Sequence, residues 1–288
     1  MVSIIIPTFN RLSWLRKCLA HLDSQKYDSS FEVIVIDDGS TDGTNQYLTS
    51  NEGNFRFTLI HLNQENRGPA AARNLGIKVA RGDIVAFLDD DSIAESNWLR
   101  EITGSFQDLP DAYAAVSGKT TMYGYSEFGA FLQENFDDSN SWITNNIAYK
   151  KSTLLKIGLF DETNFTLAAW EDLDLAYRIQ VGGYKRFYNE QAIVAHPREE
   201  SFQQLINRFR INGYGFYQFL KKWMRLDPIF ACKAIFWQLT EIHYALPFMK
   251  KINFVKYLRG LRLAYQVYGI AVGIIYRGNF PIKTRDNG

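Results

Sequence analysis

Short apolar runs alternate with amphipathic segments over the first 117 residues of the chain. Strands are predicted by compact β-branched or aromatic runs, at residues 2–6, 31–36, 55–61, 84–88 and 112–116. Helices are predicted between these runs by helical apolar spacing, at residues 11–22, in a segment ending near residue 48, and at residues 70–80. Strands that alternate with helices indicate a mostly parallel sheet with right-handed crossovers. We therefore expect a Rossmann-like half over residues 1–117.

The alternation stops in the second part of the chain. Residues 118–141 are rich in Tyr, Gly and Asn, and helical spacing dominates residues 201–276, with breaks near Pro228, Pro247 and Gly260. Between them we predict a strand, two helices and two short strands, at residues 142–150, 152–157, 170–181, 186–188 and 192–195. The expected fold is α/β, with a sheet flanked by helices. The expected domains are a body over residues 1–200, whose second half covers residues 118–200, and a helical extension over residues 201–288.

Charge also divides the chain near residue 200. Residues 1–200 hold 18 Lys and Arg against 28 Asp and Glu, whereas residues 201–288 hold 14 against 3. One interpretation of this basic, aromatic tail is a set of amphipathic helices that contacts an anionic membrane face, near a lipid-linked acceptor. The other is an ordinary helical cap on the acidic body. Nucleic-acid binding is the weakest interpretation, because no recognition motif accompanies the charge.

The compartment is predicted from cysteine use and from missing signals. Cys18 and Cys232 lie far apart without metal-type spacing, which favours a reducing compartment. The chain begins with a strand-like run rather than a signal peptide. No uncharged apolar stretch reaches the roughly 18–20 residues that a membrane-spanning helix needs. We expect a cytoplasmic protein, which reaches the inner face of the membrane if its tail binds lipid.

Three consecutive aspartates, Asp89, Asp90 and Asp91, end the strand predicted at residues 84–88. Adjacent carboxylates repel one another unless a cation lies among them. The carboxyl ends of strands are also where open α/β sheets hold ligands. A divalent metal that holds a phosphorylated substrate is therefore one explanation of the triplet, and a solvated acidic turn is the other.

Three further polar loops should reach the same edge of the sheet, at residues 7–11, 37–42 and 66–74. Each alone is compatible with a turn or a helix cap. The chain has no GxGxxG after its first strand and no GxxxxGK[ST], so dinucleotide redox chemistry and P-loop hydrolysis have no support. An acidic pocket binds a diphosphate only through a bridging cation. The joint occurrence of the four loops favours a ligand pocket.

Five segments in this order resemble glycosyltransferase family 2: SIIIPTFNR, VIVIDDGSTDGT, NRGPAAARNLG, GDIVAFLDDDS and WEDLDLAYRI. The resemblance covers about residues 2–200 and implies a GT-A fold. It implies an inverting, metal-dependent enzyme that uses a nucleotide-sugar donor, with manganese or magnesium as the cofactor. It names neither sugar nor acceptor; family frequency favours a UDP-sugar, and the implied acceptors are hydroxyls of polysaccharides, glycolipids or other cell-surface glycans.

Two other classes of function stay open at this point. A nucleotidyltransferase also uses aspartates and a metal, but the first loop here lacks the Gly-rich, basic character that such an enzyme needs. A non-catalytic nucleotide-sugar-binding module would have a decayed site, whereas the acidic motifs of this chain are intact.

The resemblance also implies roles for individual residues. Those expected at the nucleotide sugar are Pro7, Thr8, Phe9, Arg11, Asp38, Gly68, Asp89, Asp90, Asn146 and Trp170. The expected metal ligands are Asp91, Asp89 and His196. Asp172 is the expected base and Glu171 the alternative, since inverting transfer needs a carboxylate to take the proton of the acceptor. Simpler interpretations remain open. In one, Glu171 and Asp172 do no more than complement a helix dipole, and in the other His196 is structural.

Overall fold

The structure is a computed structural model that describes residues 1–123, 142–197, 202–235, 267 and 270. The chain divides into two compact units. The first unit comprises residues 1–162 and 172–199, and the second comprises residues 163–171 and 200–288.

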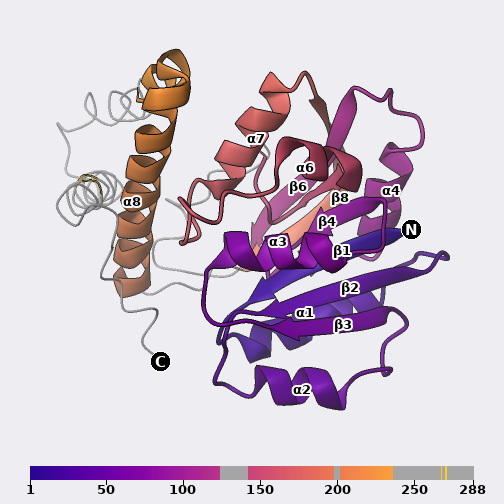
Figure 1. The fold of residues 1–288 in the computed structure, drawn as a ribbon. Helices are drawn as coiled ribbons and strands as arrows, with labels where there is room; N and C mark the ends of the chain where they lie inside the picture. The colour runs from indigo at the N-terminus through magenta and orange to yellow at the C-terminus, as the bar shows by residue number, and fades with distance from the viewer. Residues whose placement is uncertain (124–141, 198–201, 236–266, 268–269, 271–288) are drawn as a thin grey trace, which may run out of the picture. The chain divides into compact units, whose positions relative to one another are not determined.

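An eight-stranded sheet runs through the first unit in the order β3-β2-β1-β4-β7-β6-β8-β5 (Figure 1). Its strands are β1 (Val2–Thr8), β2 (Phe31–Asp37), β3 (Thr58–Asn63), β4 (Ile84–Phe87), β5 (Ile93–Ala94), β6 (Tyr113–Tyr123), β7 (Ile147–Lys150) and β8 (Lys185–Pro197). The first four strands pair in parallel and end at one edge. β7 is antiparallel to β4 and β6, β8 is parallel to β6, and β5 is antiparallel to β8.

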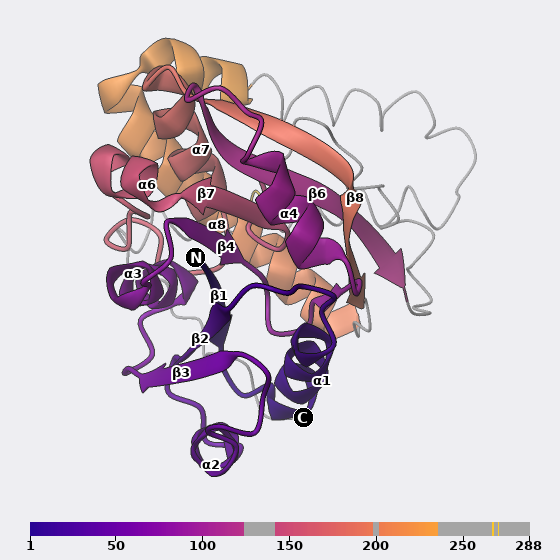
Figure 2. The same ribbon diagram turned by 90° about the vertical axis from the view of Figure 1, so that its right-hand side faces the viewer.

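Helices cover both faces of this sheet, as Figure 2 shows. One face is covered by α1 (Leu12–Asp23), α2 (Thr44–Ser50) and α4 (Trp98–Ser105), and the other by α3 (Pro69–Val79), α6 (Lys151–Ile157) and α7 (Glu171–Val181). Successive side chains of a strand point to opposite faces. Ile4 therefore packs in the cluster of α1 and α4, and Ile5 in the cluster of α3 and α7. Two covered faces explain why β1 is apolar almost throughout, and the predicted α/β class is confirmed.

Some of the observed helices and strands differ from those predicted from the pattern of apolar residues. β5 and α4 were not predicted, although Trp98, Leu99 and Ile102 form a short helical apolar face. β8 is one long strand rather than two short ones, although its register with β6 shifts between Gly118 and Lys119. That irregularity falls beside the polar residues that divide the apolar pattern of β8. Of the segment at residues 118–141, residues 124–141 lie outside the described part.

The described part of the second unit is mainly helical. α8 (Phe202–Leu226) is followed by a second helical segment at residues 228–235. Asp227 forms the break: its N–H donates to the Trp223 carbonyl at 2.8 Å, and its Oδ1 accepts from the Phe230 N–H at 3.0 Å. The break predicted near Pro228 is confirmed, and those predicted near Pro247 and Gly260 lie outside the described residues. Among the helices that are described, none combines the length and the apolar character needed to cross a membrane.

Gly118, on β6, lies at a position that admits no side chain. A Cβ there would lie 1.9 Å from the Ala192 carbonyl oxygen and 2.6 Å from Asn146 Nδ2, which itself donates to that carbonyl at 2.9 Å. We expect Gly118→Ala to lower the free energy of unfolding by about 3 kcal/mol in urea denaturation. Gly104→Ala is the matched control, because nothing lies within 4 Å of its added Cβ. Equal stabilities of the two variants would contradict this account.

Candidate active site

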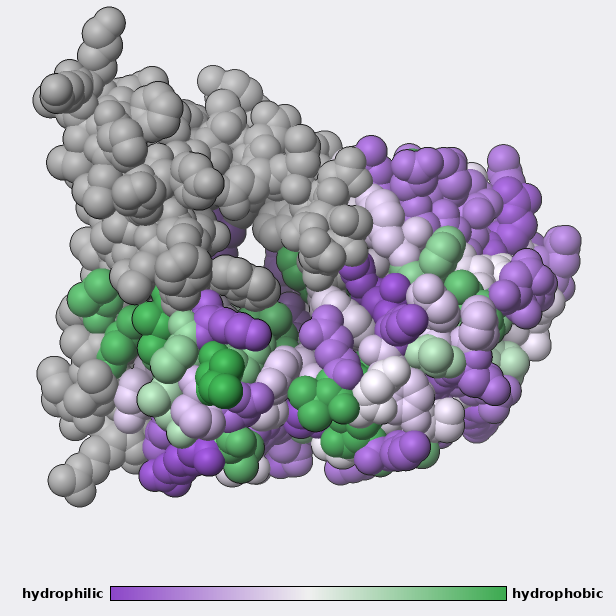
Figure 3. Space-filling model, turned by 90° about the horizontal axis from the view of Figure 1, so that it is seen from above, coloured by the Kyte–Doolittle hydropathy of each residue, from purple (hydrophilic) through white to green (hydrophobic). Residues whose placement is uncertain are grey.

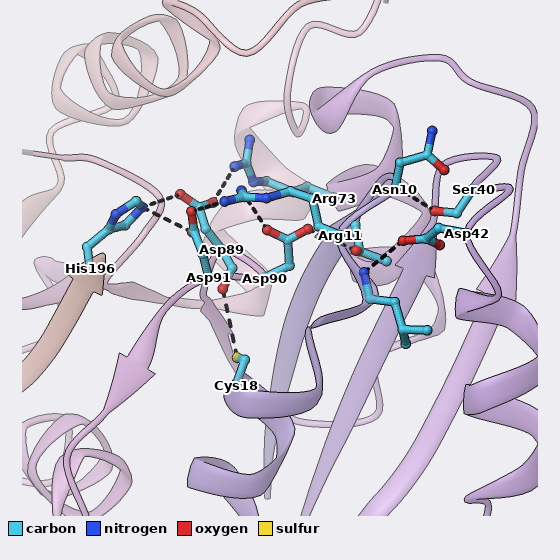
Figure 4. Close-up of polar contacts among 12 residues, drawn as sticks. Asn10, Arg11, Cys18, Ser40, Asp42, Arg73, Asp89, Asp90, Asp91 and His196 are labelled. Carbon is cyan, nitrogen blue, oxygen red and sulfur yellow. Dashed lines mark hydrogen bonds and ion pairs between the residues drawn. The ribbon is translucent and has the colours of Figure 1, made fainter. Parts of the chain in front are cut away.

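The aspartate triplet lies at the carboxyl edge of the parallel strands, where loops from three strands meet (Figure 4). Asp90 joins the triplet to the first loop, because its Oδ2 accepts from Thr8 Oγ1 and its Oδ1 from Arg11 Nη1, both at 2.8 Å. Asp91 Oδ2 accepts from Arg11 Nη2. The predicted meeting of the first and fourth loops is thus present in the structure.

Cationic side chains surround the triplet, as the repulsion among its carboxylates requires. Arg11 pairs with Asp90 and Asp91, and Arg73 Nη2 lies 3.2 Å from Asp89 Oδ1. His196 Nε2 approaches from β8 on the opposite side, 3.1 Å from Asp91 Oδ1 and 3.8 Å from Asp89 Oδ2. Figure 4 shows the histidine on one side of Asp89 and Asp91 and the two arginines on the other. The acidic turn is therefore not simply solvated.

This environment shifts the pKa values of the group in different directions. Burial disfavours a charged imidazole, but the hydrogen bonds and charges of Asp89 and Asp91 outweigh it and raise the pKa of His196 to about 10. Burial also opposes ionisation of Asp91, yet His196 and Arg11 lower its pKa to about 2. For Asp90, burial outweighs the charge of Arg11 and raises the pKa to about 7. Asp91 is thus the residue of the triplet most firmly held as a carboxylate.

Asp89, Asp91 and His196 form a set of donors that fits a divalent cation. Each offers one ligand atom, and the three atoms lie within 4.8 Å of one another. Two carboxylate oxygens and one imidazole nitrogen suit Mn²⁺, which accepts both kinds of ligand. In the structure His196 Nε2 lies against both carboxylates, and it must lose its proton to bind a cation through this nitrogen.

Asp172 is the second acidic feature of the first unit. It lies in the first turn of α7, half-buried, and its Oδ1 accepts from the Leu173 N–H at 2.8 Å. Burial raises its pKa, and the negative charge of Asp89 acts in the same direction, while Arg73 opposes both. A carboxylate with a raised pKa is a better proton acceptor than an ordinary one. The structure therefore supplies a base candidate that is separate from the triplet.

Comparison with known proteins places this arrangement in a family. The model of "Glycosyl transferase family 2" matches residues 3–167, more than half of the chain. The chain belongs to glycosyltransferase family 2. A relative, Glycosyltransferase AglE of Haloferax volcanii, is 30% identical over 219 residues, which cover 73% of this chain and 71% of the relative.

Solved structures agree on the fold of this glycosyltransferase. Mannosyltransferase PcManGT from Pyrobaculum calidifontis, in complex with GDP-Man and Mn²⁺, matches with a TM-score of 0.68 and 20% identity, over 96% of this chain and 88% of that one. TarS 1-349 of S. aureus, in complex with UDP-GlcNAc, matches with a TM-score of 0.57 and 19% identity, over 76% of this chain and 66% of that one. The GT-A fold expected from the sequence is confirmed.

The second and third loops of the glycosyltransferase are joined through Asp38. Its buried carboxylate accepts from Gln64 Nε2 at 2.6 Å and from the N–H groups of Arg67 and Gly68 at 2.9 Å each. Gly68 has φ +86°, a conformation that favours glycine, and it directs its N–H to the carboxylate at the start of α3. Asp38 thus fixes the loop geometry, and its contact with a nucleobase stays a prediction.

Of three other predicted donor-site residues, Asn146 has side-chain contacts within the protein. Asn146 is buried: its Oδ1 accepts from Trp98 Nε1 at 2.8 Å, and its Nδ2 donates to the Lys119 and Ala192 carbonyls at 2.9 Å each. Pro7 and Phe9 flank Thr8 at the end of β1. The sugar- or nucleotide-binding roles of these residues remain predictions, and the contacts of Asn146 give it a structural role.

Glu171 and Trp170 belong to the second unit. Glu171 is buried. Trp170 has φ +71°, which is rare for a bulky residue, and its ring packs on Phe216 and Phe219 with centroid separations of 4.7 and 5.2 Å. Its Nε1 donates to the Asn212 carbonyl at 3.1 Å. The structure thus ties Trp170 to α8, and its predicted contact with the donor or acceptor stays a prediction.

Two polar residues near the triplet were missed in the sequence. Arg73 follows three alanines in α3 and is buried, with no motif of its own beyond the family segment. Asn10, at φ +52°, joins the first two loops: its N–H donates to Ser40 Oγ at 2.8 Å, and its Oδ1 accepts from the Thr41 N–H at 2.7 Å. The signal for Asn10 was its place between a strand end and a helix, where Asn tolerates a left-handed backbone.

Tyr149, on β7, carries a buried hydroxyl that has no hydrogen-bond partner among the described residues. Burial, followed by the charge of Asp172, raises its pKa well above the ordinary value. An unsatisfied buried hydroxyl destabilises a fold by about 1–3 kcal/mol. We therefore expect Tyr149→Phe to raise the free energy of unfolding by about 1 kcal/mol in urea denaturation.

The control for this change is Tyr184→Phe. The Tyr184 hydroxyl accepts from Lys156 Nζ at 3.0 Å near the surface, so its removal should change stability little. A lower stability of Tyr149→Phe than of the unmodified protein would show that the Tyr149 hydroxyl is in fact satisfied.

Proposed function

We propose that this glycosyltransferase moves a sugar from a nucleotide-sugar donor, a UDP-sugar, to an acceptor hydroxyl with inversion at the anomeric carbon. The single observation that carries the proposal is the presence of two distinct acidic features in the first unit. One is the cluster of Asp89, Asp91 and His196 at the carboxyl edge of the sheet. The other is Asp172, whose pKa is raised by burial. The cluster suits the binding of a cation beside a charged leaving group, and Asp172 suits the removal of a proton from the acceptor hydroxyl.

The triplet and its cations prepare the end of the site where the nucleoside diphosphate would lie. Asp89, Asp91 and His196 would hold a divalent cation such as Mn²⁺, which, when bound, offsets the negative charge that develops on the departing diphosphate. Arg11 and Arg73 hold the triplet in place through ion pairs. Because these partners fix the carboxylates before a ligand arrives, little reorganisation is needed when the donor binds.

Asp172 would accept the proton of the acceptor hydroxyl through a carboxylate oxygen. As the hydroxyl oxygen bonds to the anomeric carbon, the bond from that carbon to the diphosphate breaks, and the nucleoside diphosphate leaves with the electron pair. A base on the face opposite the leaving group gives inversion. Oδ1 of Asp172 already accepts from the Leu173 N–H. That hydrogen bond orients the carboxyl group and leaves the other oxygen for the acceptor.

The proposed acceptor is a hydroxyl of a polysaccharide, a glycolipid or another cell-surface glycan. The relatives and neighbours support a sugar-transfer class rather than one acceptor. Pyrobaculum calidifontis PcManGT was solved with GDP-Man and S. aureus TarS with UDP-GlcNAc. The donor of this chain therefore needs its own test, in which both nucleotides take part.

The test is a thermal-unfolding screen of UDP- and GDP-sugars, each with Mn²⁺, with Mg²⁺ and with EDTA. A ligand that binds only the folded protein raises Tm with its concentration. We expect one UDP-sugar to raise Tm in the presence of Mn²⁺ and to lose this effect in EDTA. The matching sugar is then incubated with acceptor glycans, and the anomeric proton of the product is followed by NMR. Retention of configuration, or equal binding in EDTA, would contradict the proposal.

A further inference from the structure

An apolar and cationic corner lies at the junction of α8 and the helical segment at residues 228–235. Three large apolar side chains are exposed there: Met224 at 47%, Leu226 at 66% and Ile229 at 70%. Large apolar residues this exposed are few among the described residues of the chain, and three of them fall within six positions. Figure 3 shows hydrophobic side chains at its left, over α8, among hydrophilic ones. We define the corner by these three residues and by the cations Lys221, Arg225 and Lys233.

The exposure is not the result of a poorly packed helix. The same segment also holds a packed aromatic cluster: Phe219, Trp223 and Phe230 have centroid separations of 5.4 to 6.3 Å. Phe219 is fully buried and Trp223 is 7% exposed. The bend is fixed by Asp227, which caps the second helical segment through the Phe230 N–H. The three apolar side chains of the corner are thus exposed on a segment whose aromatic rings are packed together.

The cations of the corner lie on the same helix faces as two of its apolar side chains, Met224 and Ile229. Residues three or four apart share one face of a helix. Lys221 therefore shares a face with Met224 and Arg225, and Ile229 shares a face with Lys233. Lys221, Arg225 and Lys233 are all exposed, and none forms an ion pair with a described residue. Lys222 differs, because its Nζ lies over the Phe165 and Trp223 rings at 5.9 and 5.3 Å.

The charge around the corner is almost entirely positive. Residues 202–235 contain six Lys and Arg, and Asp227 is their one acidic residue, occupied as a helix cap. Exposed apolar side chains beside unpaired cations are complementary to an anionic bilayer surface, whose headgroups accept the cations and whose acyl boundary accepts the apolar side chains. A protein partner of matching shape would need an acidic rim and an apolar centre of its own.

We propose that this corner docks the glycosyltransferase on an anionic membrane surface, with Leu226 and Ile229 inserted at the headgroup boundary. The inference goes beyond the sugar transfer proposed above and does not depend on it. It uses only residues of the second unit, and it is tested by binding alone. Failure of the transfer assay would leave it unaffected, and failure of membrane binding would leave the transfer proposal unaffected.

The experiment is cosedimentation of the full chain with vesicles. We expect binding to vesicles of phosphatidylglycerol and phosphatidylcholine at equal amounts, and no binding to phosphatidylcholine alone. The double change Leu226→Ser with Ile229→Ser should lower the partition coefficient by about tenfold or more, because two apolar side chains no longer enter the boundary. Changing Lys221, Arg225 and Lys233 to Gln should lower it by about fivefold for each cation, on the anionic vesicles.

The matched control is the double change Leu155→Ser with Val181→Ser. These side chains are exposed at 55% and 68%, yet lie in the first unit outside the corner. This variant should bind vesicles as the unmodified chain does, and all variants should keep the same Tm. Absence of binding to anionic vesicles would overturn the proposal, as would equal losses in the two double variants. Sedimentation velocity gives a further outcome: a dimer of the chain that Leu226→Ser with Ile229→Ser dissociates would assign the corner to a second copy instead.

Discussion

Asp172→Asn is expected to lower kcat by about 10²- to 10⁴-fold, the range typical for removal of a general base. Asparagine keeps the shape of the side chain and can still accept from the Leu173 N–H, as Asp172 Oδ1 does at 2.8 Å. It cannot take a proton from an acceptor hydroxyl. Donor binding, which we propose uses the triplet rather than Asp172, should therefore be retained. The measurement is release of nucleoside diphosphate together with the thermal shift given by the donor.

The same change should make the protein more stable, which separates a lost base from a damaged fold. Burial raises the pKa of Asp172 above its unfolded value. A carboxyl group of this kind favours the folded state in its protonated form, so stability is lost as pH rises from the unfolded pKa through the folded one. At neutral pH the ionised Asp172 is therefore destabilising, and asparagine removes that charge. We expect a higher Tm for Asp172→Asn at pH 7 and a smaller difference at pH 4.

The pH profile of the unmodified enzyme adds a further check on this residue. The rate should fall as pH is lowered through the pKa of Asp172, because the protonated group accepts no proton. That midpoint should lie above the ordinary pKa of an aspartate, because burial raises the pKa of Asp172. Asp174→Asn is unsuitable as a control, since Asp174 is buried and paired with Arg178 at 2.9 Å. Asp111→Asn is suitable, because Asp111 is fully exposed and, among the described residues, pairs only with Lys150. Full activity of a folded Asp172→Asn would overturn the base assignment.

Patterns of apolar residues were sufficient to predict most of the first unit. β1, β2 and β4 are buried on both faces, so their apolar runs are almost continuous and their ends are clear. The predictions were less accurate where one face of a strand is solvated or its register shifts. β3 begins at Thr58 rather than residue 55, because Phe55 stacks on Phe57 at 4.8 Å ahead of the strand. A local sequence pattern shows that residues are apolar, but it does not show whether they pair with a neighbouring strand or pack against another aromatic ring.

The candidate site could be located from the sequence, but its internal contacts could not. Carboxyl ends of parallel strands meet at one edge, so the triplet and the first loop had to be neighbours once the sheet was correct. Which cation faces which carboxylate depends on tertiary packing. Arg73 lies sixteen residues before Asp89 on another element, and the hydrogen bonds of Asp38 and Asn146 depend on loops far apart in the chain. No spacing along the chain predicts such contacts.

Asp91→Asn is the second change for which we expect a large effect, and its effect on stability should have the opposite sign. Asp91 accepts from Arg11 and lies 3.1 Å from His196 Nε2, and these cations lower its pKa to about 2. A carboxyl group with a lowered pKa stabilises the fold above its unfolded pKa, and that stability is lost as pH falls through the folded value. Near neutral pH the contribution is about 2 kcal/mol. The variant should therefore unfold at lower urea concentration at pH 7.

The effect of Asp91→Asn on the proposed reaction should exceed its effect on stability. An amide oxygen is a weaker metal ligand than a carboxylate. The change also removes one negative charge, so the cluster of Asp89, residue 91 and His196 balances less of the charge of a divalent cation. We expect Mn²⁺ affinity, measured calorimetrically in the presence of UDP, to fall by about 100-fold or more, and kcat to fall with it.

His196→Gln tests the same cluster without removing a carboxylate and should weaken Mn²⁺ binding by about 10- to 100-fold. Asp83→Asn, a change at an exposed residue that pairs with the amino terminus at 3.7 Å, is the control. If Asp91→Asn bound Mn²⁺ as tightly as Asp83→Asn while remaining folded, the metal would have to lie elsewhere, and the triplet would act only through Arg11 and Arg73.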